Sequence, residues 1–260
     1  MQPMHELLGH DTATWVVPPD DEEDYRRQGA MNVLTVDGLC AARNSALEDA
    51  FAQDCWCVQM SDDIKGMSIS PDDRRAPCLD EANRRSGDEG LPIPVTPEKA
   101  ARALSEAMLD RGTFLGGAYV NNNVGFALNA EPWSAHKFIV GDFMVIRPCT
   151  PRFDDNMRLK EDYDFTAQHV DVYGAVTRMN RLFVRAKHYT NKGGAVDVRT
   201  AALEQDTISY LTAKWAARGY PKLFRLNPTR VNEVIMFYCK AYKLKLEEKH
   251  GRTAPDKYVE

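Results

Sequence analysis

Residues 39–63 read LCAARNSALEDAFAQDCWCVQMSDD and place three features in order. Apolar residues recur every three or four positions over the first part, which predicts a helix from Leu39 to Ala52. The next residues predict a buried strand from Cys55 to Met60, which runs directly into Ser61, Asp62 and Asp63. A helix followed by a strand that ends in polar residues is typical of a layered α/β domain.

The same alternation continues on both sides of this stretch. Capping residues and periodicity predict helices at 20–28, 97–111, 165–173 and 201–218. Apolar runs predict strands at 14–17, 32–36, 114–120 and 181–189, a hairpin over 138–146, and an apolar element of open type over 231–239. We therefore expect one α/β domain over residues 1–239.

Two segments depart from this alternation. Residues 70–94 are rich in Pro, Asp, Arg and Gly and have no apolar periodicity, which predicts a long mobile loop or lid. Residues 240–260 are strongly charged, which predicts a fraying C-terminal tail.

Composition narrows the class of protein. Hydrophobic residues make up 43% of the 260, enough for a well-buried core. No apolar run reaches the length of about 18 residues that a membrane span needs, and the first residues do not form a secretory signal. We therefore expect no membrane partner. The six cysteines are scattered without zinc-ribbon spacing, which favours buried or free thiols in the cytoplasm.

The net charge of −5 conceals two unlike halves. From residue 168 onward there are 17 Lys and Arg against 9 Asp and Glu, a net +8. The preceding residues hold 16 against 29, a net −13. A cation site in one half and phosphate contacts in the other fit this asymmetry, although an uneven solvated surface fits it equally well.

The acidic pair Asp62–Asp63 follows a predicted buried strand. In open α/β sheets ligands bind beyond the carboxyl ends of strands. Carboxylate oxygens suit Mn²⁺ or Mg²⁺, which would neutralise a departing diphosphate, and the second acid would accept a hydrogen bond from a ribose hydroxyl. An acidic pair that only forms a turn is the simpler alternative.

A second acidic group, Glu161, Asp162 and Asp164, lies where a loop enters a predicted helix. Capping and the helix dipole explain acids here, but three carboxylates in four residues exceed what capping requires. One of them, beside an acceptor hydroxyl, would serve as a general base.

A third group follows the predicted strand 181–189. His188 at its end is a possible metal ligand, and Gly193–Gly194 would let backbone amides approach an anion closely. A structural histidine and an ordinary turn are the alternatives.

The order of these groups resembles the GT-A glycosyltransferases, and within them the TET/JBP-associated glycosyltransferases that phages encode beside base-hydroxylating dioxygenases. The resemblance implies a GT-A-like, single Rossmann-type domain with a mixed, mostly parallel central sheet. Four segments between Thr14 and Thr200 carry it: Trp15–Pro18 with Tyr25 and Gly29, Ala42–Leu47 with Val58–Ile64, Lys160–Thr166, and Asn191–Thr200. Ser61 departs from the pattern, which often has a further acid there.

The resemblance also implies roles for individual residues. Arg43 would lie near the nucleotide or its diphosphate, and Gly193 and Gly194 would line the acceptor or diphosphate side. Asp63 would be the principal ligand of the divalent cation, with Asp62 as a ribose or metal partner and His188 as a third candidate ligand. Asp162 or Glu161 would activate the acceptor.

The implied reaction moves a sugar from a nucleotide sugar, as in a UDP-sugar, to the hydroxymethyl group of 5-hydroxymethylcytosine in double-stranded DNA, in the cytoplasm of the host cell if a phage encodes the chain. The basic half would supply the DNA contacts: Arg178, Arg181, Arg185, Arg218 and Arg225. A protein or small-molecule acceptor, and a catalytically inactive binding module, are the alternatives.

Overall fold

The computed structural model describes residues 8, 13–70, 92–119, 127, 129–186 and 199–251. A central seven-stranded sheet has the order β3–β8–β6–β9–β4–β5, and β7 pairs with β9 off this path. Its strands are β3 (Cys57–Met60), β4 (Ile64–Ile69), β5 (Ile93–Val95), β6 (Leu115–Tyr119), β7 (Trp133–Ser134), β8 (Phe143–Ile146) and β9 (Thr177–Ala186). The α/β class and the mixed sheet are therefore confirmed.

The prediction that this sheet is mostly parallel was wrong. Among the described strand pairs of the sheet, only β6–β9 is parallel, and the other five are antiparallel. The sequence pattern misled because β4, β5 and β7 all pair in antiparallel fashion, and none of the three was predicted as a strand.

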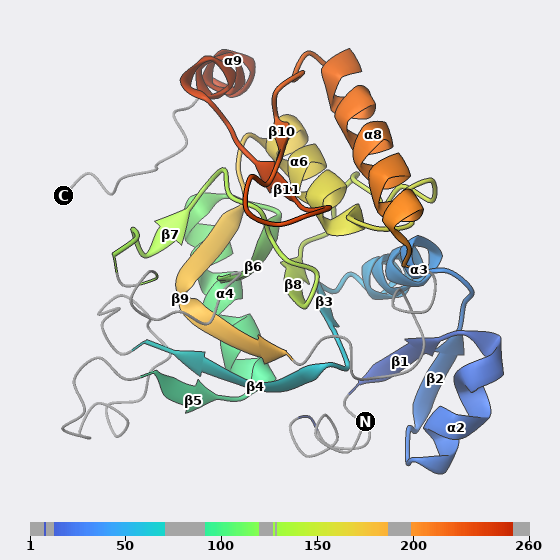
Figure 1. The fold of residues 1–260 in the computed structure, drawn as a ribbon. Helices are drawn as coiled ribbons and strands as arrows, with labels where there is room; N and C mark the ends of the chain where they lie inside the picture. Colours follow the sequence, from blue (N-terminus) through green and yellow to red (C-terminus); the bar gives the residue numbers. More distant parts are fainter. Residues whose placement is uncertain are drawn as a thin grey trace.

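A separate two-stranded sheet opens the chain. β1 (Thr14–Val17) and β2 (Asn32–Thr35) pair in parallel. Between them run a short 3-10 helix, η1 (Pro19–Asp21), and α2 (Glu22–Arg27), so this part is a β–α–β unit as predicted. Figure 1 shows the unit beyond the β3 end of the large sheet, beside α3 (Leu39–Ala52).

Helices cover both faces of the large sheet (Figure 1). α4 (Pro97–Arg111) lies on one face, and α6 (Glu161–Tyr173) and α8 (Ala201–Ala217) lie on the other. The four fully buried residues of β8 show why. Phe143 and Val145 join the core beneath α4, whereas Met144 and Ile146 join the core beneath α6, because successive strand residues point to opposite faces.

The helix boundaries follow the capping residues in the sequence. The Thr96 hydroxyl accepts a hydrogen bond from the Lys99 N–H at 3.3 Å, and Pro97 occupies the first turn of α4. Gly112 ends the same helix in the left-handed conformation. The predicted bounds of α3 and α4 are confirmed.

The C-terminal part differs from the prediction. Residues 240–250 form α9 (Lys240–His250), and not a fraying tail. Leu246 is buried, and the Lys249 ammonium donates to the Asp171 carboxylate at 2.8 Å, so a few contacts outweigh the high charge of the segment. Just before α9, β10 (Phe224–Leu226) and β11 (Val234–Met236) form an antiparallel hairpin.

Two further expectations need revision. Only β8 forms within the predicted hairpin 138–146. At the end of the predicted loop 70–94, Ile93–Val95 pairs with β4, and residues 71–91 lie outside the described residues. Among the helices that the structure describes, none is long and apolar enough to cross a membrane.

Candidate functional site

Three segments that are far apart in the sequence meet at one end of the large sheet. β3 and β8 pair so that Met60 lies opposite Phe143, and the Ser61 N–H donates to the Asp142 carbonyl at 2.9 Å. The acidic turn after β3 therefore lies beside the turn that enters β8. The turn that enters β8 also contacts the start of α6, because the Gly141 N–H donates to the Asp162 carboxylate at 3.0 Å.

The acidic turn connects directly to β4. Asp62 and Asp63 are both partly buried, and the Asp63 N–H donates to the Ser61 hydroxyl at 3.2 Å. The Tyr25 hydroxyl donates to the Asp62 carboxylate at 3.3 Å, which ties the β1–β2 unit to this turn. Burial, followed by the charge of Asp62, raises the pKa of Tyr25, so its hydroxyl stays protonated as a donor.

The start of α6 carries the second acidic group. Lys160 precedes the helix with a φ of 59°, and Glu161 is buried at 6% exposure. Asp162 accepts two backbone N–H groups, from Gly141 at 3.0 Å and from Tyr163 at 2.9 Å. Burial and the adjacent charge of Glu161 raise the pKa of Asp162 to about 7, against the opposing effects of the Gly141 N–H and Arg43. A carboxyl group with this pKa can exchange a proton near neutral pH.

Arg43 reaches this group from α3. Its guanidinium forms an ion pair with Glu161 at 3.1 Å and donates to the Gln59 side chain at 3.2 Å and to the Gly141 carbonyl at 3.3 Å. The side chain is only 17% exposed. The structure thus brings the predicted residues Arg43, Glu161 and Asp162 together, although Arg43 contacts protein groups on several sides.

Asp164 has a different role from its neighbours. It is fully buried and accepts from Lys214 at 2.9 Å, Trp215 Nε1 at 2.9 Å and Gln168 at 2.7 Å. The contacts with Lys214 and Trp215 join α6 to α8, and the contact with Gln168 lies within α6. The predicted alternative that Asp164 caps the helix is wrong, because Asp164 lies inside the first turn and Lys160 occupies the capping position.

The predicted basic face divides into buried and exposed members. Arg178 and Arg181 are 8% and 6% exposed, so their assignment to a DNA-binding face is corrected. Arg178 donates to Asn180 at 2.9 Å, and Arg181 donates to the carbonyls of Ala127 and Ala130. Burial lowers the pKa of Arg178 to about 10. Both arginines face the protein because they lie within the eight consecutive buried residues of β9.

Arg185, Arg218 and Arg225 are exposed, as a phosphate-contacting role requires. The guanidinium of Arg218 lies 5.1 Å from the Trp215 ring, and that of Arg225 lies 4.5 Å from the Phe237 ring. Each aromatic ring restrains a cation at the surface without neutralising it.

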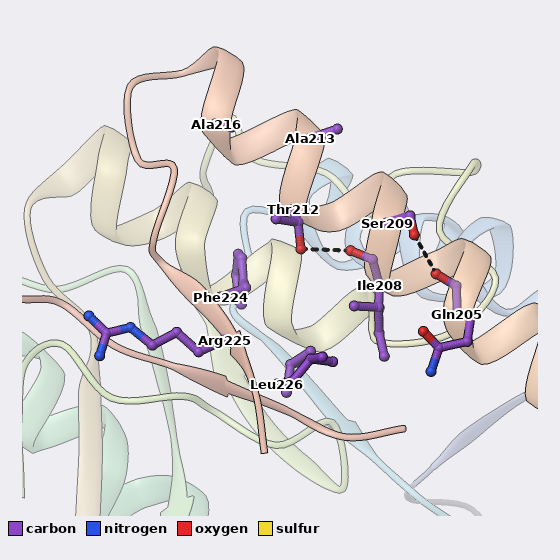
Figure 2. Close-up of a pocket in the computed structure, with 10 residues that line it drawn as sticks. Gln205, Ile208, Ser209, Thr212, Ala213, Ala216, Phe224, Arg225 and Leu226 are labelled. Carbon is purple, nitrogen blue, oxygen red and sulfur yellow. Dashed lines mark hydrogen bonds between the residues drawn. The ribbon is translucent and has the colours of Figure 1, made fainter. Parts of the chain in front are cut away.

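A groove lies between α8 and the β10–β11 hairpin, with a volume of about 490 Å³. Figure 2 shows Phe224 and Leu226 near α8, with Arg225 extending away from the helix. The small and apolar lining residues are Ile208, Ser209, Thr212, Ala213, Ala216, Phe224, Leu226 and Val234, and Gln205 and Arg225 complete the lining. The groove adjoins the start of α6, because the Tyr163 hydroxyl donates to the Val234 carbonyl at 2.9 Å.

The predicted cation site is incomplete within the part of the chain that the structure describes. There, no three His, Cys, Asp or Glu side chains are grouped so as to hold a metal ion. Asp62 and Asp63 offer two carboxylates, and the third predicted ligand, His188, lies outside the described residues, as do Gly193 and Gly194. Divalent-cation binding therefore remains a prediction.

No family model, curated protein or solved structure matches the chain. The residues of the site therefore carry the functional inference by themselves. Two of them, Gln59 and Gly141, were missed from the sequence. An alternating strand residue and a glycine in a turn carry no chemical signal until the fold places them against Arg43 and Asp162.

Proposed function

We propose that the chain is a glycosyltransferase that moves a sugar from a nucleotide sugar to the hydroxymethyl group of a modified pyrimidine in DNA. The convergence of Arg43, the Asp62–Asp63 turn and Asp162 at one end of the sheet is the observation that supports it most. These residues come from segments that resemble the TET/JBP-associated glycosyltransferases.

Asp162 is the proposed general base. With its pKa near 7, it accepts the proton of the acceptor hydroxyl as that oxygen bonds to the anomeric carbon of the sugar. The bond from the anomeric carbon to the nucleoside diphosphate breaks in the same reaction, and the diphosphate leaves with the bonding electrons. The buried Glu161, paired with Arg43, keeps a negative charge beside Asp162 and so favours the protonated form that results.

The proposed proton transfer to Asp162 does not involve the predicted divalent cation. The two described carboxylates, Asp62 and Asp63, do not by themselves make up a ligand set, so no step is assigned to a metal. Divalent-cation dependence is tested directly by treating the protein with EDTA and adding back Mn²⁺ or Mg²⁺. We expect activity to be lost and restored, and Asp63→Ala to abolish the restoration. Full activity of Asp63→Ala in metal-free buffer would show that the pair holds no required cation.

Exposed arginines support DNA as the acceptor. Arg218 and Arg225 follow each other along the end of α8 and the hairpin, and each stacks on an aromatic ring. The target base would have to leave the duplex stack to reach Asp162.

The experiment is an incubation of the protein with a panel of nucleotide sugars and DNA that contains 5-hydroxymethylcytosine, followed by nucleoside mass spectrometry. A mass increase of one sugar on the modified base is the expected result. Unmodified cytosine DNA, a peptide mixture and small hydroxyl compounds serve as comparison acceptors. Sugar transfer to one of these compounds and not to the modified DNA would show that the acceptor belongs to another class.

An inactive binding module is a second candidate, and one observation favours it. Both carboxylate oxygens of Asp162 accept backbone N–H groups, as they would in a purely structural turn. Binding of a nucleotide sugar without transfer to any acceptor, and without donor hydrolysis, would select this alternative.

A further inference from the structure

The backbone of Gly141 contacts both a cation and the proposed base. Its carbonyl accepts from Arg43 Nη2 at 3.3 Å, and its N–H donates to Asp162 Oδ2 at 3.0 Å. The carbonyl and the N–H belong to the two different peptide groups that flank the Cα of Gly141. Arg43 therefore acts on Asp162 by fixing the position of this residue, and with it the direction of the N–H that Asp162 accepts.

Several protein contacts hold Arg43 against the Gly141 carbonyl. The Gln59 side chain accepts from Arg43 Nη1 at 3.2 Å, and its own amide donates back to the Arg43 carbonyl at 2.8 Å. Gln59 is 7% exposed, so this clamp is shielded from water. The ion pair with Glu161 and the Phe153 ring, 5.3 Å from the guanidinium carbon, restrain Arg43 on two further sides.

A side chain at residue 141 would compete with Arg43 for space. A Cβ at this position would lie 2.5 Å from Arg43 Nη2 and 3.4 Å from Asp162 Oδ2. The backbone of Gly141 is not in the left-handed region, so the position of Arg43, and not backbone conformation, opposes a substitution here. Any side chain here would displace Arg43 from the carbonyl that it contacts.

We propose that Arg43 is a positioning residue that holds the backbone of Gly141 against Asp162, and does not bind the nucleotide sugar. The proposal rests on the proposed function, since it assigns Asp162 the role of base. It differs from the donor-binding role that the sequence resemblance implies for Arg43. The guanidinium is already engaged by Glu161, Gln59 and the Gly141 carbonyl, which leaves little of it for a diphosphate.

The test measures the titration of the Asp162 carboxyl carbon by NMR in the full chain, with the signal assigned from the Asp162→Asn spectrum. Gly141→Ala retains every charge but displaces Arg43 from the backbone that it holds, so the contact between the N–H of residue 141 and Asp162 should weaken. The pKa of Asp162 should then rise, by about one unit if that hydrogen bond to the carboxylate is lost. Arg43→Lys should raise it in the same direction, because an ammonium cannot contact Glu161, Gln59 and Gly141 together.

Kinetics separate the two roles of Arg43. A positioning role predicts that both variants lower kcat and leave the KM for the nucleotide sugar within about threefold, since only the base is affected. An unchanged Asp162 titration in folded variants overturns the proposal. A KM that rises about tenfold or more with an unchanged titration also overturns it and restores donor binding.

A control keeps the result interpretable. Arg102→Lys changes an exposed arginine on α4, so it should not move the Asp162 titration. If Gly141→Ala does not fold, Arg43→Lys carries the test. Because the titration needs no substrate, a shifted pKa without sugar transfer refutes only the proposed function, whereas transfer without a shift refutes only the positioning role.

Discussion

Asp162 and Asp164 lie two residues apart in the first turn of α6, and their surroundings differ in one decisive respect. Asp164 contacts Lys214 and the Trp215 N–H on α8, and these two groups and the Gln168 amide of α6 satisfy a fully buried carboxylate. Asp162 contacts the turn before β8, where backbone N–H groups bind it, and burial, followed by the charge of Glu161, raises its pKa. Asp164, which contacts the Lys214 ammonium directly, therefore stabilises the fold. Asp162, which has no such direct contact with a cation among the hydrogen bonds described above, retains a carboxyl group that can exchange protons.

Removal of Asp164 should produce the largest effect. Asp164→Ala leaves Trp215 Nε1 without its acceptor and weakens the hold on Lys214, so we expect a loss of about 3–5 kcal/mol in the free energy of unfolding. Urea denaturation measures it. Asp206→Ala, at an exposed position on α8, is the matched control and should change stability by less than about 0.5 kcal/mol. A decrease below about 1 kcal/mol for Asp164→Ala would contradict the structural role.

Asp162→Asn should lower turnover while the protein still folds. The amide keeps the shape of the side chain and one acceptor oxygen, so one of the two backbone N–H contacts is lost. It cannot take a proton, so we expect kcat to fall by about 10²- to 10⁴-fold. The measurement is sugar transfer at saturating donor, with circular dichroism as the folding check. Turnover within about threefold of the unchanged protein would remove Asp162 from the reaction.

The two carboxyl groups should also differ in how pH affects stability. Because folding raises the pKa of Asp162, the folded protein holds this proton more tightly than the unfolded chain does. The contribution of Asp162 to the free energy of unfolding is therefore most favourable below about pH 4 and is lost as the pH rises to about 7. The Asp162→Asn variant should not show this loss of stability with rising pH.

Urea denaturation at several values between about pH 4 and pH 7 tests this difference. The free energy of unfolding of Asp162→Asn, relative to that of the unchanged protein, should increase with pH over this range. A constant difference would mean that the pKa of Asp162 is not raised. Asp206→Ala, at an exposed position on α8, serves again as the control.

The sequence predicted local features of this comparison and missed the long-range ones. The limits of α3 and α4 could be predicted because periodicity and caps are local signals. The sheet order could not, because short strands such as β5 and β7 acquire their pairing only from neighbours far along the chain. Likewise, three acids at the start of α6 were evident, but the contrast between Asp162 and Asp164 depends on Gly141 and Lys214, which are distant in sequence.

The basic half illustrates the same limit. Arg178 and Arg181 belong to a strand that is paired on both sides and covered by helices, so charge counting overstated the exposed basic surface. Burial on β9 could not be predicted, since four of its first eight residues are polar and the strand does not alternate cleanly.

The smallest expected effect distinguishes exposed from buried arginines in DNA binding. Reversing the charge at Arg218 and Arg225 together should weaken DNA binding and lower the slope of log affinity against log salt by about 0.9 for each phosphate that is no longer neutralised. Donor hydrolysis should be unchanged, because the two guanidinium groups contact Trp215 and Phe237 and not the carboxyl group of Asp162. Arg102→Glu, a charge reversal at an exposed position on α4, should alter neither the affinity nor the slope.

Arg178 cannot serve in this comparison, because its buried guanidinium donates to Asn180 and a charge reversal there would disturb the sheet. If the Arg218 and Arg225 double variant keeps both the affinity and the salt slope, DNA binds to another surface, or the acceptor is not DNA.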